Sequence, residues 1–247
     1  MESFIQNNFT NITKGIEIIA AVTGIFCLKK YKGTAVIYFI YFLIYAVFVE
    51  NFGNYTKLIG NYDYLDSLSN SIKDTVFIKN YWWYQIFWII GSPLFFSFYF
   101  YKTSKNIVIK KSIKIIAFFF LLTSFLLLIF KWNALNYGFI KIIDLLSLAV
   151  VLFLVFSYFF ELLRSNQILY FYKLINLYIS IGILLFWLIV TPMTFYEVYF
   201  YDADWNFIIL KWQIFLFAIL FMYTIFTIGL IVSKPEKAIK PNEKLKY

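Results

Sequence analysis

The stretch 80–105, NYWWYQIFWIIGSPLFFSFYFYKTSK, decides the fold class of this chain. Four aromatic residues stand at positions 81–84, and no charged residue follows before Lys102. Trp and Tyr gather at the membrane–water interface, and about 20 uncharged, mostly apolar residues suffice for a helix to cross a bilayer. The stretch therefore predicts a membrane-spanning helix over 81–101, with an aromatic belt at one end and positive charge at the other.

Apolar blocks of this kind recur along the whole chain. They predict an all-α, polytopic membrane protein, a seven-transmembrane helix bundle that forms one domain over 1–233. The expected spans are 15–28, 34–52, 81–101, 113–130, 139–163, 169–191 and 207–232. The polar loop 54–80 is expected to hold a short interfacial helix over 65–76. The basic segment 234–247 is expected to be a disordered cytoplasmic tail.

The number of spans and the surroundings of the fourth span depend on particular residues. A count of six spans stays open, because the block 15–28 is short and carries Glu17, so it could lie on the membrane surface. The fourth span, 113–130, has almost no polar atoms in its core and is expected to face lipid.

Composition and charge also indicate a membrane protein. Of 247 residues, 62% are hydrophobic and 14% are charged, whereas a soluble domain has about 25% charged residues. The net charge is +9, but the lysines lie between apolar blocks, so membrane topology explains them and no nucleic-acid partner is expected. With seven spans, 15 lysines and arginines fall on one side and 7 on the other. The positive-inside rule then places the N-terminus outside and the C-terminus in the cytoplasm, and the expected location is the cytoplasmic (inner) membrane.

The inventory of reactive residues is narrow. The chain has no histidine and a single cysteine, Cys27. The commonest general base and the commonest metal ligand are therefore missing, and a thiolate cluster cannot form. No cofactor, no metal and no catalytic residues are expected, and a non-enzymatic role is favoured.

Four acidic residues lie near the predicted outer ends of four different spans: Glu17, Glu50, Asp144 and Glu197. A carboxylate within a membrane is costly unless it meets water or a partner, so such groups face the bundle interior. They predict a hydrated outer cavity. The alternative is that they are interfacial residues wetted by lipid headgroups, an interpretation that fits Glu50 and Glu197 best.

Aromatic and polar residues accompany these acids. Trp82 and Gln85 share one face of the third span, and Trp187 lies in the sixth. These side chains either bond between helices or line the same pocket. The candidate ligand-binding residues are Glu17, Glu50, Trp82, Gln85, Asp144, Trp187 and Glu197. Pro93 lies in the middle of the third span, lacks an N–H, and is expected to bend that helix.

The segments YFIYFLIYAVFVENFGNY (38–55) and NYWWYQIFWIIGSPLFFSFYF (80–100) resemble a family of uncharacterised seven-span bacterial membrane proteins. In that family an acid and an asparagine close the second helix, and an aromatic start opens the third. Its members are often encoded beside sensor histidine kinases or fused to signalling modules. The resemblance implies a role in signalling.

The sequence therefore favours a receptor-like sensory module. A small molecule or lipid headgroup would bind in the outer acidic and aromatic cavity, and a cytoplasmic signalling protein, such as a histidine kinase, would be the partner. Three alternatives stay open: a small transporter or channel subunit that uses the acids for a cation, a membrane enzyme acting on lipid or glycan precursors, and a structural membrane subunit.

Overall fold

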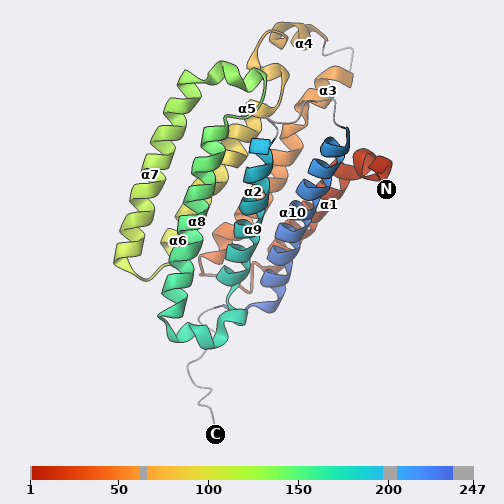
Figure 1. The fold of residues 1–247 in the computed structure, drawn as a ribbon. Coiled ribbons are helices and arrows are strands. Elements are labelled where there is room, and N and C mark those ends of the chain that lie inside the picture. The colour runs from red at the N-terminus through yellow and green to blue at the C-terminus, as the bar shows by residue number, and fades with distance from the viewer. Residues whose placement is uncertain (1, 62–65, 197–204, 236–247) are drawn as a thin grey trace.

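The computed structural model describes residues 2–61, 66–196 and 205–235. This described part of the chain is helical and contains no strand (Figure 1). Its helical elements are α1 (Glu2–Cys27), α2 (Val36–Gly53), α3 (Tyr55–Asn61), α4 (Asp66–Ile72), η2 (Val76–Ile78), α5 (Tyr81–Tyr84), η3 (Gln85–Ile90), α6 (Gly91–Thr103), α7 (Ile107–Phe130), η4 (Trp132–Asn136), α8 (Lys141–Leu163), η5 (Asn166–Lys173), α9 (Ile175–Tyr196) and α10 (Trp205–Val232).

Within the described residues, six helices are long and apolar enough to cross a membrane, which supports a multi-pass membrane protein. They cover Asn8–Cys27, Val36–Ile59, Ile107–Phe130, Lys141–Leu163, Ile175–Phe195 and Phe207–Val232. The segment that was expected to form the third span is also helical from 81 to 103. It consists of α5, a π-helical segment (η3) and α6 in direct succession, so no single helix of spanning length covers it.

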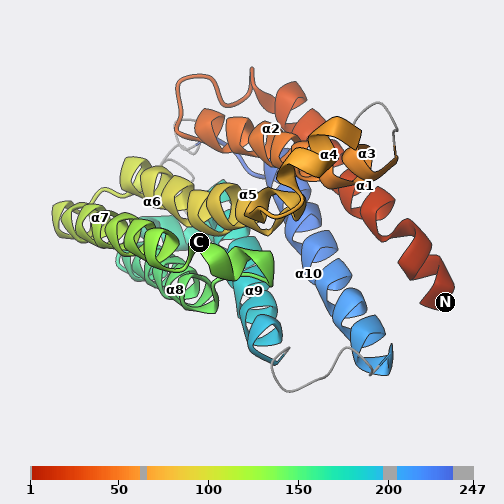
Figure 2. The ribbon, with the colours of Figure 1, turned by 90° about the horizontal axis from the view of Figure 1, so that it is seen from above.

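The long helices stand side by side and alternate in direction (Figure 1). α10 packs against α1 and α9, α1 packs against α2, and α8 packs against α9 and α6. Seen from above, α7 lies at one edge of the bundle and α1 at the opposite side (Figure 2). We refer to the end of the bundle that carries α3 and α4 as the α4 end. The opposite end, which carries the α6–α7 connection and η5, is the C-terminal end.

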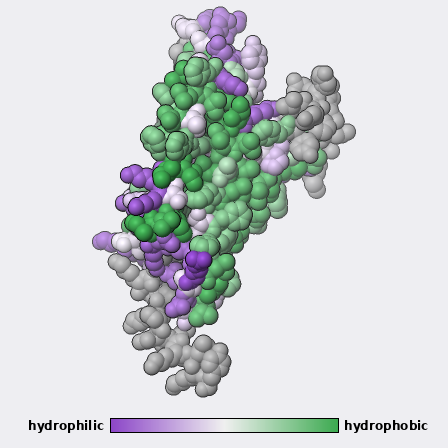
Figure 3. Space-filling model, turned by 60° about the vertical axis from the view of Figure 1, so that its left-hand side comes forward, coloured by the Kyte–Doolittle hydropathy of each residue, from purple (hydrophilic) through white to green (hydrophobic). Residues whose placement is uncertain are grey.

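The surface between the two ends is apolar. In Figure 3 hydrophobic residues form a broad field, and hydrophilic residues gather toward the ends of the molecule. α7 is the clearest case, because its large apolar side chains are exposed along its whole length, among them Phe118, Phe125 and Ile129. Aliphatic and aromatic groups displayed in this way suit contact with acyl chains rather than water.

Residues of the connection between α1 and α2 form hydrogen bonds with the C-terminal end of α10. Lys30 Nζ donates to the carbonyls of Leu230 (2.7 Å) and Ile231 (2.8 Å), where the last turn of a helix has no internal partners. The buried Tyr31 hydroxyl lies 2.6 Å from Ser233 Oγ and 3.1 Å from Leu230 O. Burial raises the pKa of Tyr31 to about 12, so its phenol stays protonated and able to donate.

Candidate functional site

A cavity of about 170 Å³ lies between five parts of the bundle, toward the α4 end. Helices far apart in the sequence contribute to it: α1, α2, the α5–η3 segment, α9 and α10. Its walls consist of apolar and aromatic groups, two tyrosines and two carboxylates. The lining residues are Glu17, Ala46, Val49, Glu50, Tyr84, Trp88, Phe186, Ile219, Met222 and Tyr223. We call it the Glu17–Glu50 cavity.

The two carboxylates reach the cavity from neighbouring helices. Glu17 comes from α1 and is buried, with 8% of its surface exposed, whereas Glu50 comes from the last turns of α2 and is half-buried. Tyr84 Oη donates to Glu50 Oε2 at 3.0 Å. Two of the four acids predicted to share an outer cavity therefore do line one cavity.

A glycine allows Tyr84 to take this position. A Cβ atom on Gly53, at the end of α2, would lie only 2.5 Å from Tyr84 Cζ and Oη. Any other residue at 53 would push the tyrosine ring away from α2. Gly53 thus acts as a positioning residue for the hydrogen bond between Tyr84 and Glu50.

Two polar atoms of the lining have no partner. Tyr223, on α10, is 1% exposed, and its hydroxyl lies near the Glu17 carboxylate. Neither Tyr223 Oη nor Glu17 Oε2 makes a hydrogen bond with the described residues. Buried polar groups are nearly always hydrogen-bonded, and an unpaired one costs about 1–3 kcal/mol. These two atoms mark a place where a polar or charged occupant would be stabilised.

The π-helical segment η3 presents two side chains to two different places. Trp88 points into the Glu17–Glu50 cavity, and Gln85 is fully buried against the start of α8, where its Oε1 accepts from Ile140 N at 2.7 Å. A π-helix widens the turn and changes the directions of its side chains, and such segments are frequent at functional sites. η3 therefore joins the cavity to α8.

Hydroxyl groups from neighbouring helices stabilise this irregular segment. Pro93 has no N–H, so the carbonyl of Ile89 lacks its usual helical donor. Ser147 Oγ, on α8, donates to Ile89 O at 2.8 Å, and Tyr45 Oη, on α2, donates to Phe87 O at 2.7 Å. Such bonds are the usual compensation for a proline within a membrane helix. Pro93, the residue predicted to bend this helix, lies in the first turn of α6, three residues after the π-helical segment ends at Ile90.

Asp144 belongs to a second polar position, beside Gln85. It lies in the first turn of α8, is 3% exposed, and neither of its oxygens has a hydrogen-bond partner among the described residues. Lys141 lies on the same turn and contributes a favourable charge. Neither Asp144 nor Gln85 lines the Glu17–Glu50 cavity. The predicted single cavity is therefore divided into two buried acidic positions.

The remaining predicted residues lie elsewhere. Trp82 Nε1 donates to Tyr55 Oη at 2.8 Å, in an aromatic cluster at the α4 end. Trp187 is buried against Phe186 and does not line the cavity. Glu197 lies outside the described residues.

The aromatic lining was missed from sequence. Tyr84, Trp88, Phe186 and Tyr223 are four among many aromatic residues in a chain that is 24% aromatic. A signal existed only for the third span, where Tyr84 and Trp88 stand four residues apart and so share a helix face. Nothing in the sequence indicates that α9 and α10 add to the same cavity.

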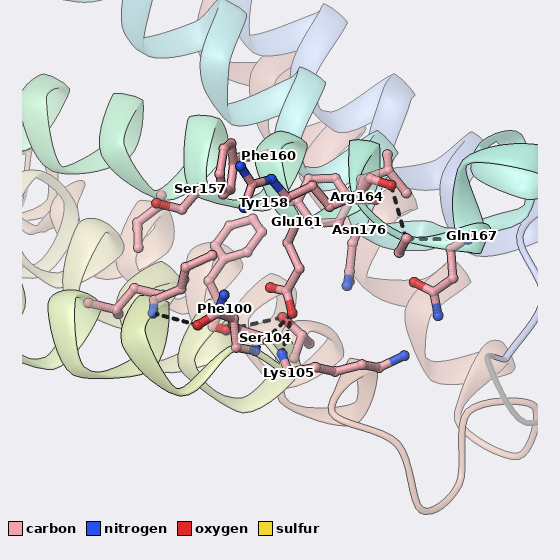
Figure 4. Close-up of a pocket in the computed structure, with 17 residues that line it drawn as sticks. Phe100, Ser104, Lys105, Ser157, Tyr158, Phe160, Glu161, Arg164, Gln167 and Asn176 are labelled. Atoms are coloured by element: carbon pink, nitrogen blue, oxygen red, sulfur yellow. Dashed lines mark hydrogen bonds between the residues drawn. The ribbon is translucent and has the colours of Figure 1, made fainter.

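A different cavity, of about 350 Å³, lies at the C-terminal end between the α6–α7 connection, α8 and η5 (Figure 4). In Figure 4 the Glu161 side chain extends toward Ser104 and Lys105. Glu161 Oε1 accepts from the backbone N–H groups of Lys105 (2.5 Å) and Asn106 (3.0 Å). This carboxylate thus holds the start of α7 onto α8.

Other polar groups of the C-terminal cavity are also engaged within the chain. The Arg164 guanidinium stacks over the Phe160 ring at 4.1 Å, and Tyr99 Oη donates to Asn176 Oδ1 at 2.6 Å. An adjoining cavity of about 280 Å³ shares Asn176 and carries Lys102 and Lys234. These contacts hold neighbouring elements together. Ser104 Oγ, which also lines the cavity at the C-terminal end, is buried without a hydrogen-bond partner among the described residues.

Comparison of the chain with protein-family models, with curated proteins and with solved structures finds no match. The function must therefore be argued from the geometry. No group of three His, Cys, Asp or Glu side chains in the described ranges is placed to hold a metal ion. What the Glu17–Glu50 cavity can do chemically is bind: it offers negative charge, aromatic faces and hydroxyls in a space suited to a small molecule.

Proposed function

We propose that the protein is a receptor-like, non-enzymatic module of the cytoplasmic membrane. It binds a small molecule or a lipid headgroup in the Glu17–Glu50 cavity and signals to a cytoplasmic protein, of which a histidine kinase is one kind. The observation that carries this proposal is the cavity itself, which two carboxylates from different helices line together with a buried tyrosine hydroxyl that has no hydrogen-bond partner among the described residues.

The proposal includes seven spans. The helical run 81–103 has 23 residues, a length of about 34 Å at 1.5 Å per residue, which exceeds the hydrocarbon thickness of about 30 Å. This length supports a seventh span in addition to the six long helices, and with seven spans the two ends of the described chain would lie on opposite sides of the membrane. The distribution of lysines supports an orientation with the α4 end outside and the C-terminal end in the cytoplasm. In this orientation the cavity faces outward.

The π-helical segment supplies a route from the cavity to the opposite end. A ligand that contacts Trp88 and Tyr84 would bias the packing of η3, and η3 is bonded to α8 through Gln85–Ile140 and Ile89–Ser147. α8 carries Glu161, which holds the start of α7 at the C-terminal end. A ligand can shift these contacts only if it binds two packings of η3 with different affinities.

The test is a gentle extraction of the tagged protein from its native membrane, followed by mass spectrometry of co-purified proteins and small molecules. The wild type is compared with the double variant Glu17→Gln/Glu50→Gln and with Glu161→Gln, which alters a carboxylate at the other end but keeps an acceptor oxygen. We expect a bound small molecule on the wild type and on Glu161→Gln, its loss from the double variant, and a cytoplasmic protein co-purifying with the wild type. A wild type that carries neither a small molecule nor a partner would refute the proposal.

A further inference from the structure

We propose that the ligand of the Glu17–Glu50 cavity is an organic cation, recognised by an ammonium group placed between the two carboxylates and the surrounding aromatic rings. This inference rests on the proposed function, because it names the chemical class of that ligand.

The first argument is charge. Among the residues that line the cavity, Glu17 and Glu50 are the charged ones, and both are acidic. The nearest basic residue on α1 is Lys14, but its Nζ donates to Asn51 Oδ1 at 3.2 Å and does not line the cavity. Glu17 is the buried member of the pair, with Oε2 unpaired among the described residues, and the half-buried Glu50 places a second negative charge near it. A buried carboxylate without a partner is strongly disfavoured, and a like charge nearby adds to the cost. A positively charged occupant would offset the negative charge of both groups.

The second argument is the aromatic wall. The rings of Trp88 and Phe186 stand nearly perpendicular, with an interplanar angle of 86° and centroids 6.1 Å apart, and form a corner of the cavity. Tyr84 and Tyr223 add two further rings. The faces of aromatic rings attract cations, most strongly where water is excluded, and aromatic cages of this composition recognise alkylated ammonium groups.

The third argument is the Tyr223 hydroxyl, which lies near the Glu17 carboxylate. Tyr223 Oη is buried in the lining and has no hydrogen-bond partner among the described residues. A phenol can both donate and accept. It can therefore accept from an N–H of the cation or donate to a hydroxyl carried by it, which would satisfy an atom that the chain leaves unpaired.

A metal ion fits this site less well than an organic cation. Calcium takes six to eight oxygen ligands, and magnesium demands an octahedron of them. The lining supplies two carboxylates and two phenols. Its other side chains present aliphatic or aromatic carbon, except for the indole N–H of Trp88, which can only donate, and the weakly accepting thioether of Met222. These carbon surfaces can contact the alkyl groups of an ammonium compound but cannot coordinate a metal.

The same ammonium chemistry has two sources, a free small amine or the headgroup of a lipid. The experiment therefore uses the full chain in lipid nanodiscs made only of phosphatidylglycerol, which carries no ammonium group. The probe is choline, and its matched control is 3,3-dimethyl-1-butanol, a neutral molecule of nearly the same shape. Binding is measured as the saturable rise in thermal unfolding temperature. In a second set of nanodiscs, phosphatidylethanolamine is included in the bilayer, so that its headgroup supplies the ammonium group. These discs are measured first without choline and then with choline added.

We expect choline to stabilise the wild type and 3,3-dimethyl-1-butanol to have no saturable effect. Glu17→Gln and Glu50→Gln are each expected to weaken choline binding at least about tenfold, while Glu161→Gln leaves it unchanged. Unfolding without probe shows whether each variant is folded, and the half-buried Glu50 is the safer of the two substitutions. Stabilisation in the phosphatidylethanolamine discs, with a weaker response to added choline, would identify the lipid headgroup as the source.

Two results would overturn the inference. If the neutral probe binds as well as choline, the cavity is a ligand site but does not select a cation, and the proposed function stands without this inference. If neither probe binds and phosphatidylethanolamine has no effect, the cation class is wrong, and the extraction experiment decides separately whether the cavity holds any ligand.

Discussion

Substitution of Gly53 by alanine tests how the cavity is built. The added methyl group would lie 2.5 Å from Tyr84 Cζ and Oη, where ordinary contacts lie at 3.4–4 Å. The end of the ring must therefore retreat by about 1 Å from α2. We expect this movement to break the hydrogen bond between Tyr84 and Glu50.

The expected change in the free energy of unfolding combines two costs and one gain. Overpacking costs about 1–3 kcal/mol, and a hydrogen bond to a charged group contributes about 1.5–3 kcal/mol. Alanine recovers up to about 1 kcal/mol through its better helix propensity. We expect Gly53→Ala to lower the free energy of unfolding by about 1.5–5 kcal/mol. Gly15→Ala, on α1, is the matched control, because a Cβ there meets no atom within 4 Å; it is expected to raise stability by about 0.5–1 kcal/mol.

The assay is equilibrium unfolding in mixed micelles, followed by circular dichroism. Gly53→Ala is measured in the wild type and in a Tyr84→Ala background, where the ring that causes the clash is gone. We expect the cost of Gly53→Ala to disappear in that background, which gives a coupling energy between the two positions. Equal effects of Gly53→Ala and Gly15→Ala, or a cost that persists without the Tyr84 ring, would show that the reasoning is wrong.

Two further predictions concern single hydrogen bonds. Tyr31→Phe removes a hydrogen-bonded hydroxyl and should lower the free energy of unfolding by about 1 kcal/mol. Tyr223→Phe removes a hydroxyl that has no hydrogen-bond partner among the described residues, and it should leave the free energy of unfolding unchanged or raise it by about 1 kcal/mol. The same unfolding assay separates the two variants, and equal losses of stability would contradict the account. Ser147→Ala should cost about 1 kcal/mol because its hydroxyl supplies Ile89 O with a donor. In a Pro93→Ala background the backbone N–H returns and the cost of Ser147→Ala should shrink, so an unchanged cost would count against the proposed role of Ser147.

The helices were predictable because each is an apolar block of spanning length with polar ends. The first block was expected to begin near 15, but helix α1 extends over Glu2–Cys27. Its polar N-terminal residues hid this extension from a reading based on hydrophobicity. The α-helical reading of 81–101 was also too simple, because η3 is π-helical there. Gly91 and Pro93 signalled a break in regularity but not its form.

The candidate site was predictable only in part. Glu17 and Glu50 could be identified because a charge inside an apolar block must face a polar space. Two acids line the same cavity only if their helices are neighbours in the bundle. These neighbours are set by packing between segments that can be more than 150 residues apart, such as those that carry Glu17 and Tyr223. The role of Gly53 was likewise invisible, since it depends on a ring from α5 that lies against α2.

The most direct test of the central claim, that the Glu17–Glu50 cavity holds a ligand, is photo-crosslinking in the native membrane. p-Azidophenylalanine replaces Phe186, which lines the cavity, or its neighbour Trp187, which is equally buried but does not line it. After illumination, intact-protein mass spectrometry should show a small-molecule adduct on the protein labelled at 186 and none on the protein labelled at 187. The same adducts from both positions, or none from 186, would contradict the claim.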